Sequence, residues 1–141
     1  MYARLAVAAV AALIGLGGNA RAEQPSVAQT VRYGGGPAYG GFAVTGGALV
    51  ACRVFNFGAT AVTISVRQIF ANTGDPVTIN SDTCNVSLLP GKSCAYASQY
   101  STSQLAYSCR LVARSTAVNI SGVVEIQSLH GDILAALPLT K

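Results

Sequence analysis

Apolar and polar residues alternate in short runs along this chain, and the clearest run lies within residues 60–70. Its apolar set is Val62, Ile64 and Val66, and its polar set is Thr63, Ser65 and Arg67. A period of two places the two sets on opposite faces of a β-strand. We therefore expect the apolar set to face a core and the polar set to face solvent.

Similar patterns predict further strands over residues 26–33, 48–55, 77–79, 105–113, 120–129 and 133–139, and one that runs through Tyr96. The expected inward positions are Val50, Cys52, Val54, Tyr107, Cys109, Leu111, Ala113, Val124 and Ile126. The expected outward positions are Arg110, Val112, Arg114, Val123, Glu125 and Gln127. No amphipathic helical period follows residue 22, so the pattern predicts an all-β protein.

Turn residues separate these runs. Residues 34–47 contain seven glycines together with Pro37, Tyr39 and Phe42, and we expect a loop there. Residues 72–76 and 130–132 are also typical of turns. The resulting seven or eight short strands indicate an antiparallel sandwich or barrel.

The N-terminal segment has the order of a secretory signal peptide. Arg4 precedes an apolar run over residues 5–16, and the small-x-small triplet of Ala20, Arg21 and Ala22 follows. The run is too short for a membrane span of about 20 residues. We predict a signal peptide over residues 1–22, a first strand and Gly-rich segment over 23–47, and the sandwich over 48–141. The protein would then be periplasmic or secreted.

Four cysteines follow the predicted signal peptide, an even number that is typical of disulfides in an exported chain. Three pairings are possible. We favour Cys84 with Cys94, because the Pro90-Gly91 turn between them folds the segment back. Cys52 would then pair with Cys109. The spacing and the single histidine argue against a metal site, and we expect no cofactor.

The pair of Cys52 and Cys109 favours an immunoglobulin-like sandwich. Both lie mid-strand, with several strands between them, and Tyr107 stands two residues before Cys109, where a tyrosine corner would place it. The chain has no tryptophan, the usual neighbour of such a bridge. A jelly roll or a small barrel is the alternative.

The segments Cys52-Arg-Val-Phe-Asn56-Phe-Gly58, Ala61-Val-Thr-Ile64, Leu89-Pro-Gly-Lys-Ser-Cys94 and Tyr107-Ser-Cys109 resemble a group of small exported bacterial proteins. The Asn-x-Gly turn and the segment before Cys94 are also similar to Hydin-type immunoglobulin-like modules. The resemblance covers about residues 49–139. It implies a sandwich in a bacterial envelope or outside the cell, and it carries no catalytic residue.

The sequence does not contain an assembled catalytic set. The single histidine, His130, lies in a predicted turn, and no serine occupies a strained nucleophile elbow. Five acidic residues remain after residue 22, mostly in turns or at the terminus. With seven basic residues (9 − 2) and five acidic ones, the net charge after residue 22 is +2, too low to indicate nucleic acid. We expect no enzyme.

Three arginines are candidate binding residues. If their strands adjoin in one sheet, Arg67, Arg110 and Arg114 share its outer face with Val112, Val123, Glu125 and Gln127 beside them. This ledge would meet an acidic glycan or an acidic partner protein. The alternative is a solvated face on which Glu125 pairs with an arginine.

The leading functional hypothesis is a non-enzymatic, exported structural or protein-interaction module. It would bind an envelope or extracellular protein through a sheet edge, the Gly-rich segment or the arginine ledge. The second hypothesis is a small-ligand or glycan-binding module that uses Tyr33, Tyr39 and Phe42 as stacking surfaces. An enzyme is the third.

Overall fold

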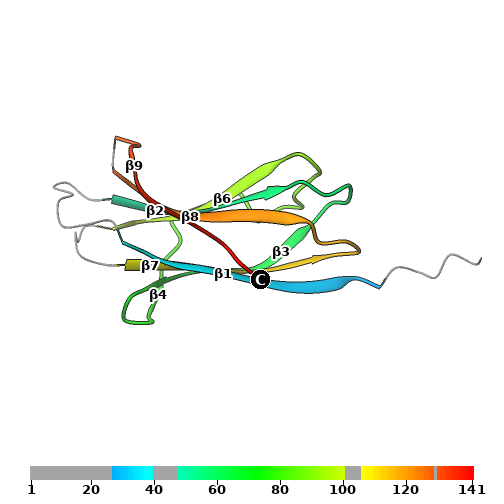
Figure 1. Cartoon of the computed structure of the whole chain (residues 1–141), viewed down its shortest axis with the longest axis horizontal. Helices are drawn as coiled ribbons and strands as arrows, with labels where there is room; N and C mark the ends of the chain where they lie inside the picture. Colours follow the sequence, from blue (N-terminus) through cyan, green and yellow to red (C-terminus); the bar gives the residue numbers. More distant parts are fainter. Residues whose placement is uncertain (1–26, 40–47, 101–105, 129) are drawn as a thin grey trace, which may run out of the picture.

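The computed structural model describes residues 27–39, 48–100, 106–128 and 130–141, which form two antiparallel β-sheets (Figure 1). The first sheet has the order β1-β7-β3-β4 and the second β5-β6-β2-β8-β9. The strands are β1 Gln29–Tyr39, β2 Ala48–Asn56, β3 Thr63–Ala71, β4 Pro76–Val77, β5 Ser81–Asp82, β6 Ser93–Tyr100, β7 Ala106–Ser115, β8 Ile120–Ser128 and β9 Ile133–Pro138. No helix in the described residues is long and apolar enough to cross a membrane.

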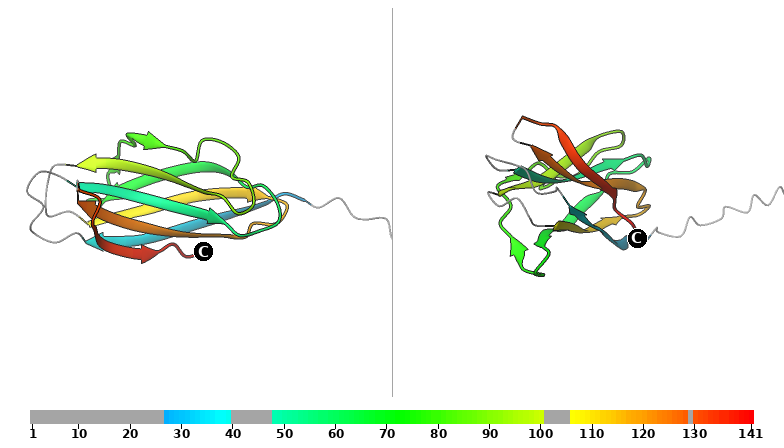
Figure 2. Two further views of the ribbon diagram at one scale, coloured as in Figure 1. Left: turned by 90° about the horizontal axis from the view of Figure 1, so that it is seen from above. Right: turned by 60° about the vertical axis from the view of Figure 1, so that its left-hand side comes forward.

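The two sheets pack face to face, as the views in Figure 2 show, and the predicted all-β, antiparallel sandwich is confirmed. The predicted inward set on β2, β7 and β8 is buried. Strand β5 was not predicted, because two residues are too few to give a periodic pattern.

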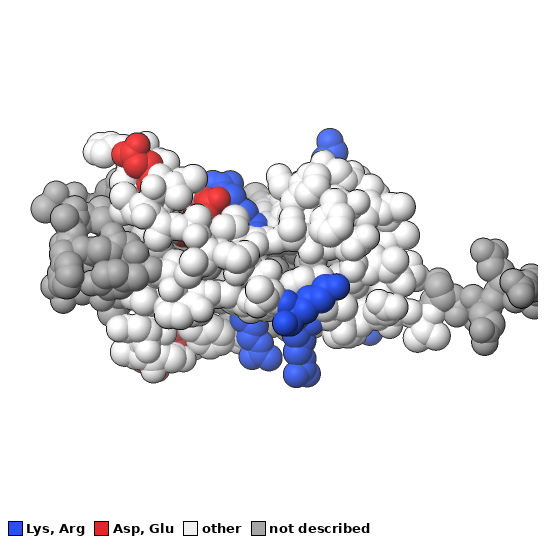
Figure 3. Space-filling model, in the orientation of Figure 1, with Lys and Arg blue, Asp and Glu red and all other residues white. Residues whose placement is uncertain are grey.

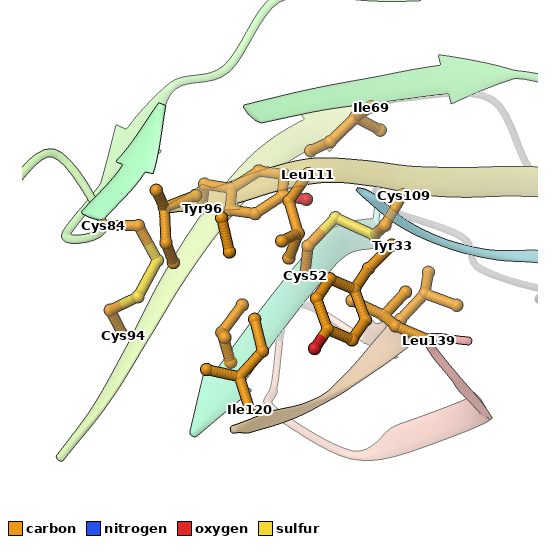
Figure 4. Close-up of a cluster of buried hydrophobic side chains, with 14 of the residues drawn as sticks. Tyr33, Cys52, Ile69, Cys84, Cys94, Tyr96, Cys109, Leu111, Ile120 and Leu139 are labelled. Carbon is orange, nitrogen blue, oxygen red and sulfur yellow. A yellow bond between two sulfur atoms is a disulfide. The ribbon is translucent and has the colours of Figure 1, made fainter. Parts of the chain in front are cut away.

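Both predicted disulfides are present (Figure 4). Cys52 on β2 and Cys109 on β7 join the two sheets through the core, and Cys84 pairs with Cys94 across the turn before β6. All four cysteines are buried. Two disulfides are typical of a protein that folds in an oxidising compartment.

The predicted loop over residues 34–47 was wrong for its first part. Strand β1 continues to Tyr39 and pairs with β7 throughout, apart from an irregularity between Gly35 and Ala38. Gly35 permits this, because the C-terminal tail passes close to β1: a Cβ at Gly35 would lie 2.5 Å from the Pro138 carbonyl oxygen, and Gly34 and Thr140 exchange two backbone hydrogen bonds of 2.9 and 2.8 Å. Leu139 is buried between the sheets, so this tail closes one side of the sandwich. Residues 40–47 lie outside the described part.

A β-bulge in β3 overturns the predicted orientation of Arg67. The register with β7 shifts between Ile64 and Val66, so the parity of every later side chain is reversed. Arg67 now lies opposite Leu111, a core residue, and Ile69 opposite Cys109. Arg67 therefore faces the space between the sheets, and Val66 faces outward.

Candidate functional site

Three arginines share the outer face of the first sheet, but they are not the three predicted. Strand β7 lies between β1 and β3, and its outward residues include Arg110 and Arg114. Arg32 on β1 pairs with Val112, midway between them. We call Arg32, Arg110 and Arg114 the basic face. In Figure 3, Lys and Arg side chains gather along the lower side, where Figure 1 places β1 and β7.

The basic face carries no neutralising charge among the described residues. The described residues form two ion pairs, one with Arg53 and one with Arg67. Neither pair includes an arginine of the basic face. The cross-strand neighbours of Arg110 are Gly34 and Gln68, and those of Arg114 are Thr30 and Thr63. The surface is therefore a cluster of positive charges on a neutral background.

Apolar and polar surface adjoins these charges. Val112 is only 9% exposed although it points outward, since it lies among the three arginines and Val66. The Oε1 atom of Gln68 is buried and has no hydrogen-bond partner. Arg114 also lines a hollow of about 420 Å³, whose walls are Ala28, Ala61, Thr63, Ser115 and Thr116.

Arg67 has a structural partner instead of a free surface. Its Nε donates to the Oδ2 of Asp82 at 2.6 Å, and a second nitrogen donates to the Ile64 carbonyl. Asp82 belongs to β5 of the other sheet, and its second oxygen accepts from the Cys84 amide. This pair links the sheets on the side opposite the C-terminal tail.

Glu125 and Gln127 were correctly assigned to the outer side of β8, but two other predictions for them were wrong. Strand β8 belongs to the second sheet, so neither residue lies beside Arg110 or Arg114, and the same holds for Val123. Both are also buried. The small side chains of Ala51 and Ala136 flank Glu125 on the neighbouring strands and leave a recess for its carboxylate.

The Glu125 carboxylate holds an arginine on this second outer face. Its Oε2 accepts from Arg53 Nε at 2.7 Å and from Gln127 Nε2 at 2.6 Å. An arginine partner for Glu125 was foreseen, but only for an arginine of the predicted ledge. Arg53 lines a hollow of about 310 Å³ together with Phe55, Ser93, Ser121, Val123 and the backbone of the strands between them.

The aromatic candidates divide differently. Tyr33 is buried in the core near Leu139 and the Cys52–Cys109 disulfide (Figure 4), so its prediction as a stacking surface was wrong. Tyr39 ends β1 opposite Ala106. Phe42 lies outside the described residues. The exposed rings in the described part instead include Phe55 and Phe57.

His130 lies in the exposed turn before β9, as predicted. The side chain of Asp132 bonds to Ser128 Oγ. No group of three His, Cys, Asp or Glu residues in the described ranges is placed to hold a metal ion.

In the described part of the chain, Tyr33 and Tyr96 have clearly shifted pKa values, and both belong to the core. Burial raises the pKa of Tyr96 well above its ordinary value of 10.0, with Arg67 opposing the shift and Asp82 adding to it. Burial also raises the pKa of Tyr33, which the Ile120 backbone partly offsets, although no hydrogen bond of ordinary geometry reaches the hydroxyl. These shifts follow from packing and do not mark a reaction centre.

Sequence reasoning missed Arg32 and Arg53. Arg32 lies in a predicted strand, but its place beside β7 depends on the pairing of β1 with β7. The sequence of either strand by itself does not show which strand it pairs with. Arg53 also lies in a predicted strand, over residues 48–55, but nothing in the local pattern connects it to Glu125, 72 positions away. The bulge did leave a signal: the buried apolar positions change from even numbers, Val62 and Ile64, to an odd one, Ile69.

A search of family models, curated proteins and solved structures found no match to this chain. The resemblance to small exported bacterial proteins and to Hydin-type modules therefore stays a prediction. The features of the chain that bear on its function are its two outer faces.

Proposed function

We propose that the protein is a non-enzymatic, exported interaction module that binds an acidic partner protein through the basic face. The observation that carries the proposal is the cluster of Arg32, Arg110 and Arg114 on one rigid sheet, without an ion-pair partner in the described residues. Uncompensated charge of one sign attracts partners of the opposite sign and steers their approach.

The spacing of the arginines favours an extended peptide segment. Arg110 and Arg114 are four positions apart along β7, which corresponds to about 13 Å, and Arg32 lies midway on the next strand. Side chains on one face of an extended chain repeat every ~7 Å. Acidic residues at alternate positions of a partner strand would therefore meet the three guanidinium groups in turn, each through charge-assisted hydrogen bonds.

The compartment fits this role. The two disulfides support export to the periplasm or the exterior, and the predicted signal peptide would direct it. Residues 1–22 lie outside the described part. The partner would then be an envelope or extracellular protein with an acidic segment.

Site-directed cross-linking in the producing cell tests this proposal. A photo-reactive amino acid at Gln68, beside Arg110 on the basic face, should give one dominant cross-linked protein. The same group at Gln99, on an exposed position of β6 in the other sheet, is the matched control. Replacing Arg32, Arg110 and Arg114 together with Gln should abolish the Gln68 product and leave folding unchanged.

Salt supplies an independent readout. The affinity of the purified pair should fall as ionic strength rises, because surface charges are screened within about 10 Å at 0.1 M. A Gln68 product that persists in the triple variant would refute the proposal. So would a product that proves to be a second copy of the chain.

A further inference from the structure

We propose a second binding site, for a small acidic sugar, in the hollow around Arg53 and Phe55 on the outer face of β6, β2 and β8. It lies on the opposite sheet from the basic face and does not depend on the partner protein proposed above. Its volume of about 310 Å³ is near the lower end of the range for ligand pockets, and suits a ligand of about one sugar ring.

A buried carboxylate, that of Glu125, orients the arginine in this hollow. Glu125 binds only the Nε of Arg53, and the carboxylate is itself buried, with a side chain 10% exposed, and fixed by Gln127. The Arg53 side chain is 51% exposed. Neither terminal nitrogen of Arg53 has a hydrogen-bond partner among the described residues, so both can donate to a ligand in the parallel geometry that matches a carboxylate.

An exposed aromatic ring lies beside this arginine. Phe55 follows Arg53 by two residues on β2, so both point to the same face, and 41% of Phe55 is exposed. Its cross-strand partners are Ser93 on β6 and Ser121 on β8, which place a hydroxyl on either side of the ring. Neither hydroxyl has a hydrogen-bond partner in the described part of the chain.

This combination of groups selects the ligand class. The C–H face of a sugar ring packs on an aromatic ring, its hydroxyls pair with serine hydroxyls that both donate and accept, and a carboxylate on the ring reaches Arg53. An uncharged sugar would leave the terminal guanidinium nitrogens unused. We therefore assign the site to uronic acids, free or at the end of a chain.

Titration of the oxidised, ¹⁵N-labelled protein with galacturonic acid and its trimer, followed by amide chemical shifts, tests the assignment. Galactose is the uncharged comparison. The acid should give saturable shifts that concentrate on β2, β6 and β8, and galactose should bind more weakly. Phe55→Leu should weaken binding about tenfold. Phe57→Leu, at an exposed ring outside the hollow, should leave it unchanged.

The double variant R53Q/E125Q removes both charges together, so no buried carboxylate is left unpaired. It should keep the folded amide spectrum and lose the preference for the acid over galactose. Absence of saturable shifts with either acid overturns the assignment. Shifts confined to β1 and β7 also overturn it, because they would show simple attraction to the basic face. Neither result bears on the proposed partner protein, whose test uses the Gln68 cross-link.

Discussion

The same residue type has different roles on the two sides of one strand pair. Arg110 and Arg114 lie on an outer face without an ion-pair partner in the described residues, whereas Arg67 on the adjacent strand is enclosed between the sheets and bonded to Asp82. Arginine suits both settings, because it carries a long apolar stem and a planar group with five donors. Its role therefore depends on which face the backbone presents.

Replacing these arginines one at a time should separate the roles. Arg67→Ala removes the partner of a carboxylate that is only 23% exposed, and we expect it to lower the free energy of unfolding by about 1–3 kcal/mol. Arg110→Ala and Arg114→Ala should each change it by less than about 0.5 kcal/mol. Urea unfolding of the oxidised protein measures all three, and equal losses would contradict the assigned orientations.

Asn56 is a second residue that we expect to contribute strongly to stability because of its position. It is fully buried at the end of β2, where its Nδ2 donates to the Thr60 and Leu88 carbonyls and its Oδ1 accepts from the Gly58 amide. Asn56→Ala should lower the free energy of unfolding by about 3 kcal/mol. Each of the three hydrogen bonds contributes roughly 1 kcal/mol, and their buried backbone partners would be left unpaired. Asn85→Ala, at an exposed position, is the control and should be near neutral in the same thermal melts.

At the scale of elements, the alternation of apolar and polar residues predicted the long strands. The Pro90-Gly91 turn predicted the Cys84–Cys94 disulfide, which closes a short loop. Alternation cannot register one inserted residue, and the bulge at Ser65 therefore reversed the expected faces of β3 beyond it. The alternation pattern of a strand also does not show which distant segment of the chain packs against that strand. The glycines of β1 indicated a loop by composition, but in the fold one of them, Gly35, makes room for the C-terminal tail.

Two adjacent glycines of β1 provide a matched test of that tail crossing. A Cβ at Gly35 would lie 2.5 Å from the Pro138 carbonyl oxygen and 2.7 Å from Leu139 Cδ2. A Cβ at Gly34 has no neighbour nearer than 3.9 Å. Gly35→Ala should therefore displace the tail and cost about 2 kcal/mol or more, with faster hydrogen exchange at Thr140. Gly34→Ala should be neutral or slightly stabilising. Equal effects would show that the tail does not constrain β1.

In the whole molecule, three features join the two sheets around one core, and the two outer faces differ chemically. A disulfide crosses its centre, the Arg67–Asp82 pair joins one side and the Leu139 tail closes the other. Tyr96 adds a fourth link, because its hydroxyl reaches from β6 to the Arg110 carbonyl on β7 at 3.0 Å. We therefore expect both outer faces, the basic face and the Phe55 hollow, to keep their shape whether or not a partner or ligand is bound.

Enclosure of Tyr96 also predicts how the whole molecule responds to alkali. Burial raises its pKa in the folded state above the 10.0 of the unfolded chain, so the folded protein binds more protons than the unfolded one above that pH. Its contribution is then complete below pH 10 and is lost as pH rises, at up to about 1.4 kcal/mol per pH unit. Tyr96→Phe should cost about 1 kcal/mol at pH 7, through the lost bond to Arg110, and flatten the decline above pH 10. Urea unfolding from pH 7 to 11.5 compares the slopes, with Tyr33→Phe as the variant for a less shifted phenol. Parallel alkaline limbs for wild type and Tyr96→Phe would mean that this hydroxyl ionises without opening the sandwich.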